Sequence, residues 1–311
     1  MKIAVVGGGS IGSYLAALFS LGRNDVHLVC RGAQLQAIRS RGLVLKKGQE
    51  ARVVPQLSAT DEPSMIGHAD IVVMSVKLYD LAASTRQIHS LIGPDTLIVP
   101  IQNGVTAHEI IGREIGAEHA AGGTVFISAA LEQPGVVSSR SAVDQLVFGE
   151  VDGTISARAE AFRRVCEQSG IQVDLCTRIV GRMWEKFVSI VGINVVCCLA
   201  RQSVGYVLAD ERLATCLVRA MDEAATVARA LNIDIAPDTI DRALAFGKHV
   251  AYGTRISMLE DIESGKPTEV EWLNGHLVRL AGQLGIDVPT NALAYACLAR
   301  YSPAYGQSPH T

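Results

Sequence analysis

The hydrophobic and polar positions of this chain follow two different periods, one in each half. In the first half, short apolar runs alternate with helix-like segments and turn residues, a pattern typical of βαβ units built on a largely parallel sheet. The runs predict strands at residues 3–6, 26–30, 71–76 and 97–100. From Arg178 to Ala299 the apolar spacing is helical, which predicts an all-helical second half.

The end of the first half has a different pattern. A Gln133-Pro134-Gly135 turn predicts antiparallel edge strands at residues 120–130 and 136–138. Residues 146–149 are expected to return to the sheet, and residues 155–168 are predicted to form a helix.

The change of period falls near residues 170–177. With 311 residues the chain is long enough for two cores. We therefore predict two domains, residues 1–172 and residues 173–311.

Composition excludes several classes of protein. The 49% hydrophobic and 19% charged content is typical of a well-packed soluble globule, and no apolar run suggests a membrane partner. The net charge is −3 without a dense Lys/Arg block, so no nucleic-acid partner is expected. No signal-peptide pattern follows Met1, which leads us to expect a cytoplasmic protein. The seven cysteines include no CxxC or Cys/His pair at zinc spacing, so we expect reduced thiols and no metal.

A glycine motif follows the first predicted strand. In KIAVVGGGSIGS, residues 2–13, the pattern Gly7-x-Gly9-x-x-Gly12 stands between a strand and a helical stretch. Gly7 would allow a tight turn, Gly9 the approach of a pyrophosphate, and Gly12 close packing of helix on strand. The helix N-terminus adds free N–H groups and its positive dipole end. We assign phosphate binding to these glycines with Ser10 and Ile11; the alternative is a glycine-rich turn without a ligand.

The second strand ends in Arg31, where an NAD-binding unit would carry an acid. A carboxylate would repel a 2′-phosphate, whereas a guanidinium can bind it with two hydrogen bonds. We therefore predict NADPH rather than NADH as the cofactor. The alternative for Arg31 is an exposed surface arginine.

Two further strands end in polar residues, at the sheet edge where ligands of such folds collect. Lys77 follows the strand at 71–76 and is a candidate contact for the cofactor or substrate. Asn103 follows the strand at 97–100 and could hydrogen-bond beside the reacting carbon. The alternatives are a solvated lysine and an Asn-Gly turn.

The helical half carries an unusual lysine. Lys186 stands between Trp184 and Phe187 at the head of an apolar run, and Asn194 falls on roughly the same helix face. Apolar surroundings lower the pKa of a lysine while a nearby carboxylate raises it, which can suit the lysine to act as a general acid. The alternative is a side chain whose stem packs on Trp184 while its amine reaches water.

A carboxylate candidate lies further along the chain. One helix is predicted to stop near Gly265, and another to start at Thr268, with Thr268 and Glu271 in a capping-box pattern. Glu269 would then lie in the first helical turn. It could be a partner for the lysine, or it could simply favour the helix dipole.

Taken together, these segments resemble the 2-dehydropantoate 2-reductases, also called ketopantoate reductases. The resemblance runs along nearly the whole chain and is carried by GGGSIG at 7–12, CRG at 30–32, SVK at 75–77, QNG at 102–104, WEKF at 184–187, IN at 193–194 and SMLEDIESGKPTEVEWLNG at 257–275. It implies an α/β protein, with an N-terminal Rossmann dinucleotide-binding domain followed by an all-helical C-terminal substrate and catalytic domain. It also implies reduction of ketopantoate to pantoate by NADPH, a step of pantothenate biosynthesis.

The resemblance implies roles for single residues as well. Lys186 matches the family's catalytic lysine and Glu269 its active-site glutamate. Ser257 and Asn194 match substrate-binding residues, and Asn103 matches an active-site residue of the nucleotide domain. Lys77 likewise matches a residue of that domain, and Arg31 matches the 2′-phosphate contact.

One position departs from the family pattern. Ile190 stands where members commonly carry an asparagine, so a 2-oxo acid with a more apolar tail is an alternative substrate. A non-enzymatic NADP(H)-binding sensor is the alternative from another class. The apolar helices around 195–199 and 217–231 fit a homodimer and a buried core equally well.

Overall fold

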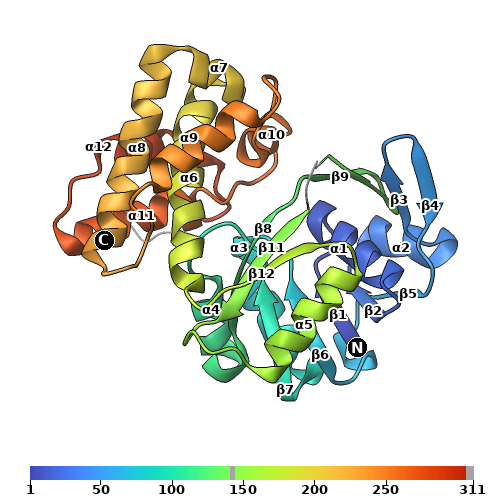
Figure 1. Ribbon diagram of the computed structural model, residues 1–311. Helices are drawn as coiled ribbons and strands as arrows, with labels where there is room; N and C mark the ends of the chain where they lie inside the picture. The colour runs from blue at the N-terminus through green and yellow to red at the C-terminus, as the bar shows by residue number, and fades with distance from the viewer. Residues whose placement is uncertain (141–143, 306–311) are drawn as a thin grey trace. The chain divides into compact units, whose positions relative to one another are not determined.

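The computed structural model describes residues 1–140 and 144–305, which form two compact units. The first unit comprises Met1–Gln102 and Thr106–Ile179, and the second comprises Asn103–Val105 and the chain from Val180 onward. The first unit is built on a parallel sheet and the second is helical (Figure 1). The predicted fold class is therefore confirmed.

The main sheet of the first unit has five strands in the order β5-β2-β1-β6-β7, and every neighbouring pair is parallel. The strands are β1 (Lys2–Val6), β2 (Asp25–Val29), β5 (Leu57–Thr60), β6 (Ala69–Met74) and β7 (Ile92–Pro100). Four of them match the strands that the apolar runs predicted. Because the strands are parallel, their carboxyl ends share one edge, and the strand order reverses at β1, where such folds bind ligands.

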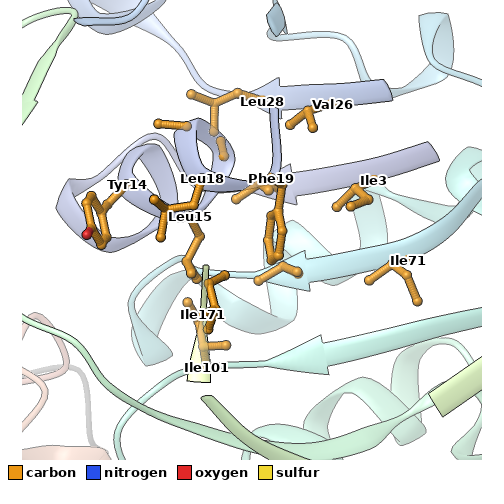
Figure 2. Close-up of a cluster of buried hydrophobic side chains, with 14 of the residues drawn as sticks. Ile3, Tyr14, Leu15, Leu18, Phe19, Val26, Leu28, Ile71, Ile101 and Ile171 are labelled. Atoms are coloured by element: carbon orange, nitrogen blue, oxygen red, sulfur yellow. The ribbon is translucent and has the colours of Figure 1, made fainter. Parts of the chain in front are cut away.

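In the described part of this unit, five helices connect the strands. They are α1 (Ser10–Leu21), α2 (Gly32–Arg41), α3 (Leu78–Gln87), α4 (Ala107–Glu114) and α5 (Ala157–Gln168). Short 3₁₀ turns lie at Pro63–Met65, His89–Leu91 and Ala117–His119. Figure 2 shows Phe19 of α1 beside Ile3 of β1 and Leu15 of α1 nearer to Ile171, within a buried core to which each such side chain contributes about 1.5–3 kcal/mol. This packing holds α1 against β1.

Two smaller sheets correct the predicted edge strands. The first has the order β12-β11-β8 and the second the order β4-β3-β10-β9. Their strands are β3 (Val44–Lys47), β4 (Glu50–Val53), β8 (Ala121–Phe126), β9 (Ala129–Gln133), β10 (Val136–Ser139), β11 (Gln145–Glu150) and β12 (Gln172–Leu175). The predicted strand at 120–130 is wrong as one element, because β8 pairs with β11 while β9 pairs with β10.

The expected domain boundary between residues 172 and 173 falls inside β12. That strand pairs in parallel with β11, so it belongs to the first unit. The change of hydrophobic period marks the end of the last helix before β12, whereas the structure divides later, between Ile179 and Val180.

The described part of the second unit contains only helices as regular elements. They are α6 (Ile179–Ala200), α7 (Val204–Ala209), α8 (Glu211–Ala230), α9 (Thr239–His249), α10 (Ser257–Glu263), a π-helical segment (Glu271–Gly275), α11 (His276–Leu284), α12 (Pro289–Leu298) and a 3₁₀ turn (Ala299–Tyr301). Helices α6 and α8 run side by side (Figure 1), and a Cβ on Gly192 would lie 2.5 Å from Met221 Cγ. Gly192 thus permits the close packing of α6 on α8.

Helix α6 is long and apolar enough, by length and composition, to cross a membrane. Of its most apolar stretch of 18 residues, 61% is buried inside the protein. The core helix of a soluble protein passes the same test, so its apolar content is explained by packing.

Candidate functional site

The loops at the carboxyl edge of the main sheet are tied together in a row. Beyond the strand ends, Gly7 N donates to Val29 O at 3.0 Å, Ser75 N to Val6 O at 2.8 Å, and Ile101 N to Met74 O at 3.1 Å. These hydrogen bonds continue the parallel ladders into the loops after β1, β6 and β7. The glycine motif therefore lies between the loops that carry Arg31 and Lys77.

Two of the three motif glycines are required by the chain itself. Gly7 has a φ of +115°, and a Cβ there would lie 2.8 Å from Ser75 C. A Cβ on Gly12 would lie 2.0 Å from Gly7 O, so α1 could not begin so close to β1. The turn and packing tasks predicted for these glycines are confirmed.

Gly9 differs from both. Its φ of −74° suits any residue, and among the described residues no atom lies within 4 Å of a Cβ built on it. Neither backbone strain nor packing against the described residues explains a glycine here. The space beside Gly9 is open, as an approaching phosphate requires.

The first residues of α1 follow directly. Gly9 is the N-cap and offers no side chain to the helix, while Ser13 N donates to Gly9 O at 2.9 Å. The Oγ atom of Ser10 accepts a hydrogen bond from Leu131 N at 3.2 Å. Ile11 packs partly buried against the core. The N–H groups of the first turn and the positive end of the dipole form the kind of anion site seen in dinucleotide-binding proteins.

Arg31 and Lys77 occupy equivalent positions. Arg31 is the N-cap of α2 and Lys77 the N-cap of α3, each after a parallel strand of the sheet. Arg31 is exposed and Lys77 partly exposed. Both cations thus stand at the carboxyl edge where the sequence predicted them.

Asn103 lies in the loop after β7 and is partly exposed. The next residue, Gly104, has a φ of +107°, which favours glycine. The preceding residue, Gln102, is buried, and its Nε2 donates to Met74 O and Val76 O, both at 2.9 Å. These bonds fix the loop against the end of β6. The segment Asn103–Val105 groups with the helical unit.

Helix α6 has one partly open stripe on an otherwise buried surface. Between Met183 and Cys198, the partly exposed residues are Lys186, Ser189, Ile190 and Ile193. Burial of the ammonium group lowers the pKa of Lys186 from 10.5 to about 8. Because the residue keeps part of its surface open, it can exchange a proton with its surroundings. A lysine that titrates near neutrality is suited to general acid catalysis.

Asn194 lies on α6 two turns beyond Lys186, as the spacing predicted. Only 5% of its surface is exposed, and its Nδ2 has no hydrogen-bond partner among the described residues. A buried amide donor without a partner costs about 1–3 kcal/mol. Such a donor is available to a ligand oxygen.

Ser257 is exposed at the first position of α10. This helix lies near the C-terminal part of α6. Burial raises the pKa of the Cys197 thiol to about 12, and the nearby positive charge of Arg255 acts against that rise. Since Arg255 lies two residues before Ser257, the start of α10 lies near the C-terminal part of α6, the helix that carries Lys186 and Asn194.

The capping box predicted around Glu269 is wrong. The hydroxyl of Thr268 donates to Tyr301 O at 3.3 Å, and the carboxylate of Glu271 accepts hydrogen bonds from Arg279 and Tyr295. Contacts with distant residues thus replace the local pair. Glu269 lies just before the π-helical segment, 8% exposed, and its carbonyl accepts bonds from Trp272 N and Leu273 N at 3.0 and 3.1 Å.

Three amide residues to which the sequence assigned no role support these elements. They are Gln34, Gln102 and Asn274, all buried. Gln102 is the first residue of the QNG segment at 102–104, and Asn274 lies in the segment at 257–275, so the family resemblance was the available signal. Gln34 gave no signal, because its partners are distant in the sequence.

The fold and the glycine loop define a two-domain Rossmann protein, and comparison with known proteins gives its family. The first part, residues 3–153, matches the model "Ketopantoate reductase PanE/ApbA", and residues 178–302 match "Ketopantoate reductase PanE/ApbA C terminal". The chain belongs to the ketopantoate reductase family and is an oxidoreductase of the 2-dehydropantoate 2-reductase type.

Individual relatives are distant but cover nearly the full length. The chain is 28% identical to an uncharacterized oxidoreductase, YkpB, of Bacillus subtilis over 97% of this chain and 99% of the relative. It is 29% identical to a 2-dehydropantoate 2-reductase of Mesorhizobium japonicum over 93% and 94%. A 2-dehydropantoate 2-reductase structure from Geobacter metallireducens has a TM-score of 0.89 at 26% identity, covering 97% of this chain and 100% of that one. A D-mandelate dehydrogenase solved with NADH and anilino(oxo)acetate has a TM-score of 0.89 at 21% identity over 97% and 98%, which shows the shared fold.

Proposed function

We propose that this protein reduces the ketone of 2-dehydropantoate, also called ketopantoate, to pantoate with NADPH, as a step of pantothenate biosynthesis. The observation that carries the proposal is Lys186, whose pKa is lowered to about 8 on the partly open stripe of α6. A protein that only binds NADP(H) does not need a lysine whose pKa is lowered in this way. Membership of the ketopantoate reductase family supplies the substrate class.

The first unit fits a nicotinamide dinucleotide. The open space at Gly9 and the uncapped N–H groups of α1 suit a pyrophosphate, with Gly7, Ser10, Ile11 and Gly12 shaping the same loop. Arg31 at the end of β2 suits a 2′-phosphate, and the positive charge of Lys77 suits a second phosphate or the substrate. When bound, the cofactor supplies the hydride.

The second unit supplies the proton and the substrate contacts. As negative charge develops on the carbonyl oxygen, Lys186 stabilises it and donates its proton. The unpartnered amide of Asn194 donates to the same polar group, and Asn103 assists in orienting it. Ser257 holds the substrate near its carboxylate, and Glu269 adjusts the charge state of Lys186. These assignments rest on the positions of the residues and on the family match.

A different 2-oxo acid is the second candidate substrate. Ile190 lies on the same partly open stripe as Lys186, where it presents an apolar side chain rather than an amide. A substrate without the terminal hydroxyl would leave no polar group unpaired there. The fold also accommodates a D-mandelate dehydrogenase, whose structure contains NADH, so both cofactors belong in the test.

The test is the initial rate of cofactor oxidation by the purified protein. Ketopantoate and trimethylpyruvate, which lacks only the terminal hydroxyl, are each assayed with NADPH and with NADH. Efficient turnover of ketopantoate with NADPH supports the proposal, and preference for trimethylpyruvate favours the second candidate. NADPH binding without turnover of either substrate contradicts both and leaves a sensor.

The role of Lys186 has its own test. Lys186→Ala is expected to lower kcat by orders of magnitude and leave the Kd of NADPH within about twofold, since the proton donor is lost but the dinucleotide site is not. Lys248→Ala is the matched control, because Lys248 is an exposed lysine of the same unit. Near-normal turnover by Lys186→Ala would refute the assignment.

A further inference from the structure

A chain of three hydrogen bonds leads from the β9–β10 hairpin to the glycine loop. Gly135 N donates to Gln34 Oε1 at 2.8 Å, Gln34 Nε2 donates to Ser13 Oγ at 3.0 Å, and Ser13 Oγ donates to Gly8 O at 3.1 Å. We call these contacts the Gln34 chain. Each donor has a defined acceptor, so the direction of every bond is fixed.

The two side chains of the Gln34 chain are buried, and Gln34 was marked by no motif. Gln34 is 9% exposed and Ser13 0%. Burying a glutamine costs side-chain entropy, and a buried amide group that lacks a hydrogen bond lowers stability further. A fully bonded buried network specifies one geometry. The feature specified here is the shape of the glycine loop.

Packing holds Gly8 from the other side. A Cβ on Gly8 would lie 2.4 Å from Cys30 Cβ and 3.2 Å from Gln34 Cγ. The backbone of Gly8 therefore lies tightly against the end of β2 and the first turn of α2. Gln34 thus occupies the space where a Gly8 side chain would stand, and it reaches the Gly8 carbonyl through Ser13.

Because the peptide unit is planar, the orientation of the Gly8 carbonyl also fixes the orientation of the Gly9 N–H group. Gly8 C=O and Gly9 N–H belong to one trans peptide and point in opposite directions. Ser13 holds the carbonyl toward α1, so the N–H of Gly9 points away from Ser13. At Gly9 the space for a Cβ is open. The Gln34 chain thus orients a backbone donor of the candidate phosphate site.

The same residue links the two parts of the candidate cofactor site. Gln34 lies in the first turn of α2, whose N-cap is Arg31. The hairpin contacts the loop a second time, where Leu131 N donates to Ser10 Oγ at 3.2 Å. The loop is therefore supported by the hairpin at both Gly8 and Ser10.

We propose that Gln34 is a positioning residue that holds the glycine loop in its phosphate-binding shape through Ser13 and Gly8. The inference rests on the proposed function, because it assumes that a dinucleotide binds at this loop. Gln34 acts on the pyrophosphate site, which NADPH and NADH share. Arg31 acts on the 2′-phosphate, which only NADPH carries.

The test is the Kd of NADPH and of NADH, measured by calorimetry without substrate, for wild type, Gln34→Leu, Ser13→Ala and the double variant. Leucine has a similar volume but neither hydrogen-bonding group. We expect Gln34→Leu to raise both Kd values roughly tenfold and equally, the scale of one lost hydrogen bond. The double variant should bind each dinucleotide no more weakly than the weaker-binding single variant, because both substitutions interrupt the same Gln34 chain. Gln36→Leu, at an exposed position of α2, should bind as wild type does.

Other outcomes overturn the proposal. Unchanged Kd values for Gln34→Leu, or additive losses in the double variant, show that the contacts do not position the loop. If Gln34→Leu does not fold, Ser13→Ala decides alone, since it interrupts the chain beside Gly8 without altering the packing of Gln34. If wild type binds neither dinucleotide, the proposed function fails first and this inference with it. Normal wild-type binding with unaffected variants refutes the inference alone.

Discussion

The side-chain amide of Asn274 donates a hydrogen bond of 3.2 Å to the backbone carbonyl of Val191, and a second of 3.0 Å to Asn291 Oδ1. Asn274 is completely buried and belongs to the π-helical segment Glu271–Gly275 that follows Glu269. Val191 lies on α6 between Lys186 and Asn194. One side chain therefore ties the segment after Glu269 to the helix that carries two of the candidate site residues.

We expect Asn274→Ala to affect both stability and turnover. Two buried acceptors lose their donor, so the free energy of unfolding should fall by about 2–4 kcal/mol. With the segment loosened from α6, kcat should fall severalfold while the Kd of NADPH stays unchanged. Urea unfolding and steady-state rates measure the two effects. Gln283→Ala, at an exposed position of α11, is the control; a variant as stable and as active as this control would contradict the role given to Asn274.

Alanine substitution at Gly12 should lower stability, whereas alanine substitution at Gly9 should weaken NADPH binding. In Gly12→Ala the new Cβ meets Gly7 O at 2.0 Å, so α1 must shift and the protein should lose about 2 kcal/mol or more of stability. In Gly9→Ala the Cβ enters open space, so stability should be unchanged within about 0.5 kcal/mol. The Kd of NADPH should nevertheless rise at least tenfold, because the methyl group occupies the path of the phosphate. Thermal unfolding combined with calorimetric titration separates the two cases, and unimpaired NADPH binding by Gly9→Ala would remove the dinucleotide from this loop.

The contrast between these glycines also shows what the sequence could reveal. The tasks of Gly7 and Gly12 are local, so the spacing of the motif predicted them correctly. Strands β1, β2, β6 and β7 were equally accessible, because each contains a short apolar run. The strand β4 was not, since it is exposed along its whole length and owes its pairing to β3.

Contacts between distant residues account for the remaining errors and omissions. The strand predicted at 120–130 is divided because β8 and β9 find different partners. Thr268 was assigned to a capping box, yet its hydroxyl bonds the carbonyl of Tyr301. Gln34 has its hydrogen-bond partners at Ser13 and Gly135, far away on both sides. Helical spacing placed Lys186 and Asn194 correctly on α6, whereas their roles in catalysis stay predictions.

The lowered pKa of Lys186 predicts how stability and activity change with pH. The folded-state pKa is about 8 and the ordinary value 10.5, so between these values the unfolded chain binds more protons and stability rises with pH. Lys186→Met should therefore be more stable than wild type at pH 7, by about 1–2 kcal/mol after allowance for the partly open side chain, and the difference should shrink toward pH 10. Urea unfolding at both pH values tests this, with Lys248→Met as the exposed control.

If Lys186 is the general acid, wild-type kcat should decline as pH rises through about 8, because the proton to be donated is lost. The rate of NADPH oxidation at saturating substrate, followed from pH 6 to 10, measures this decline. A rate that stays level to pH 10 would mean that another group supplies the proton.

Removal of Arg31 should separate the two cofactors. Arg31 is exposed at the N-cap of α2, and a guanidinium bound to a 2′-phosphate contributes a charge-assisted hydrogen bond. Arg31→Ala should therefore raise the Kd of NADPH roughly tenfold or more and leave that of NADH within about twofold. Arg39→Ala is the control, because Arg39 is an exposed arginine of the same helix. Equal losses for both cofactors would mean that Arg31 supports the fold of α2 rather than reading the phosphate.

Substitution at Ile190 should change the choice of substrate. Ile190 is partly exposed one turn from Lys186, so Ile190→Asn places an amide beside the lysine without opening the core. A site that hydrogen-bonds a hydroxyl rejects the analogue that lacks it, because its polar group is then left unpaired. The ratio of kcat/KM for ketopantoate to kcat/KM for trimethylpyruvate should rise roughly tenfold or more. Ser189→Asn puts the same amide at the neighbouring position of the stripe and serves as the control. A ratio that does not change in Ile190→Asn, or that rises equally in Ser189→Asn, would show that the substrate tail is recognised elsewhere.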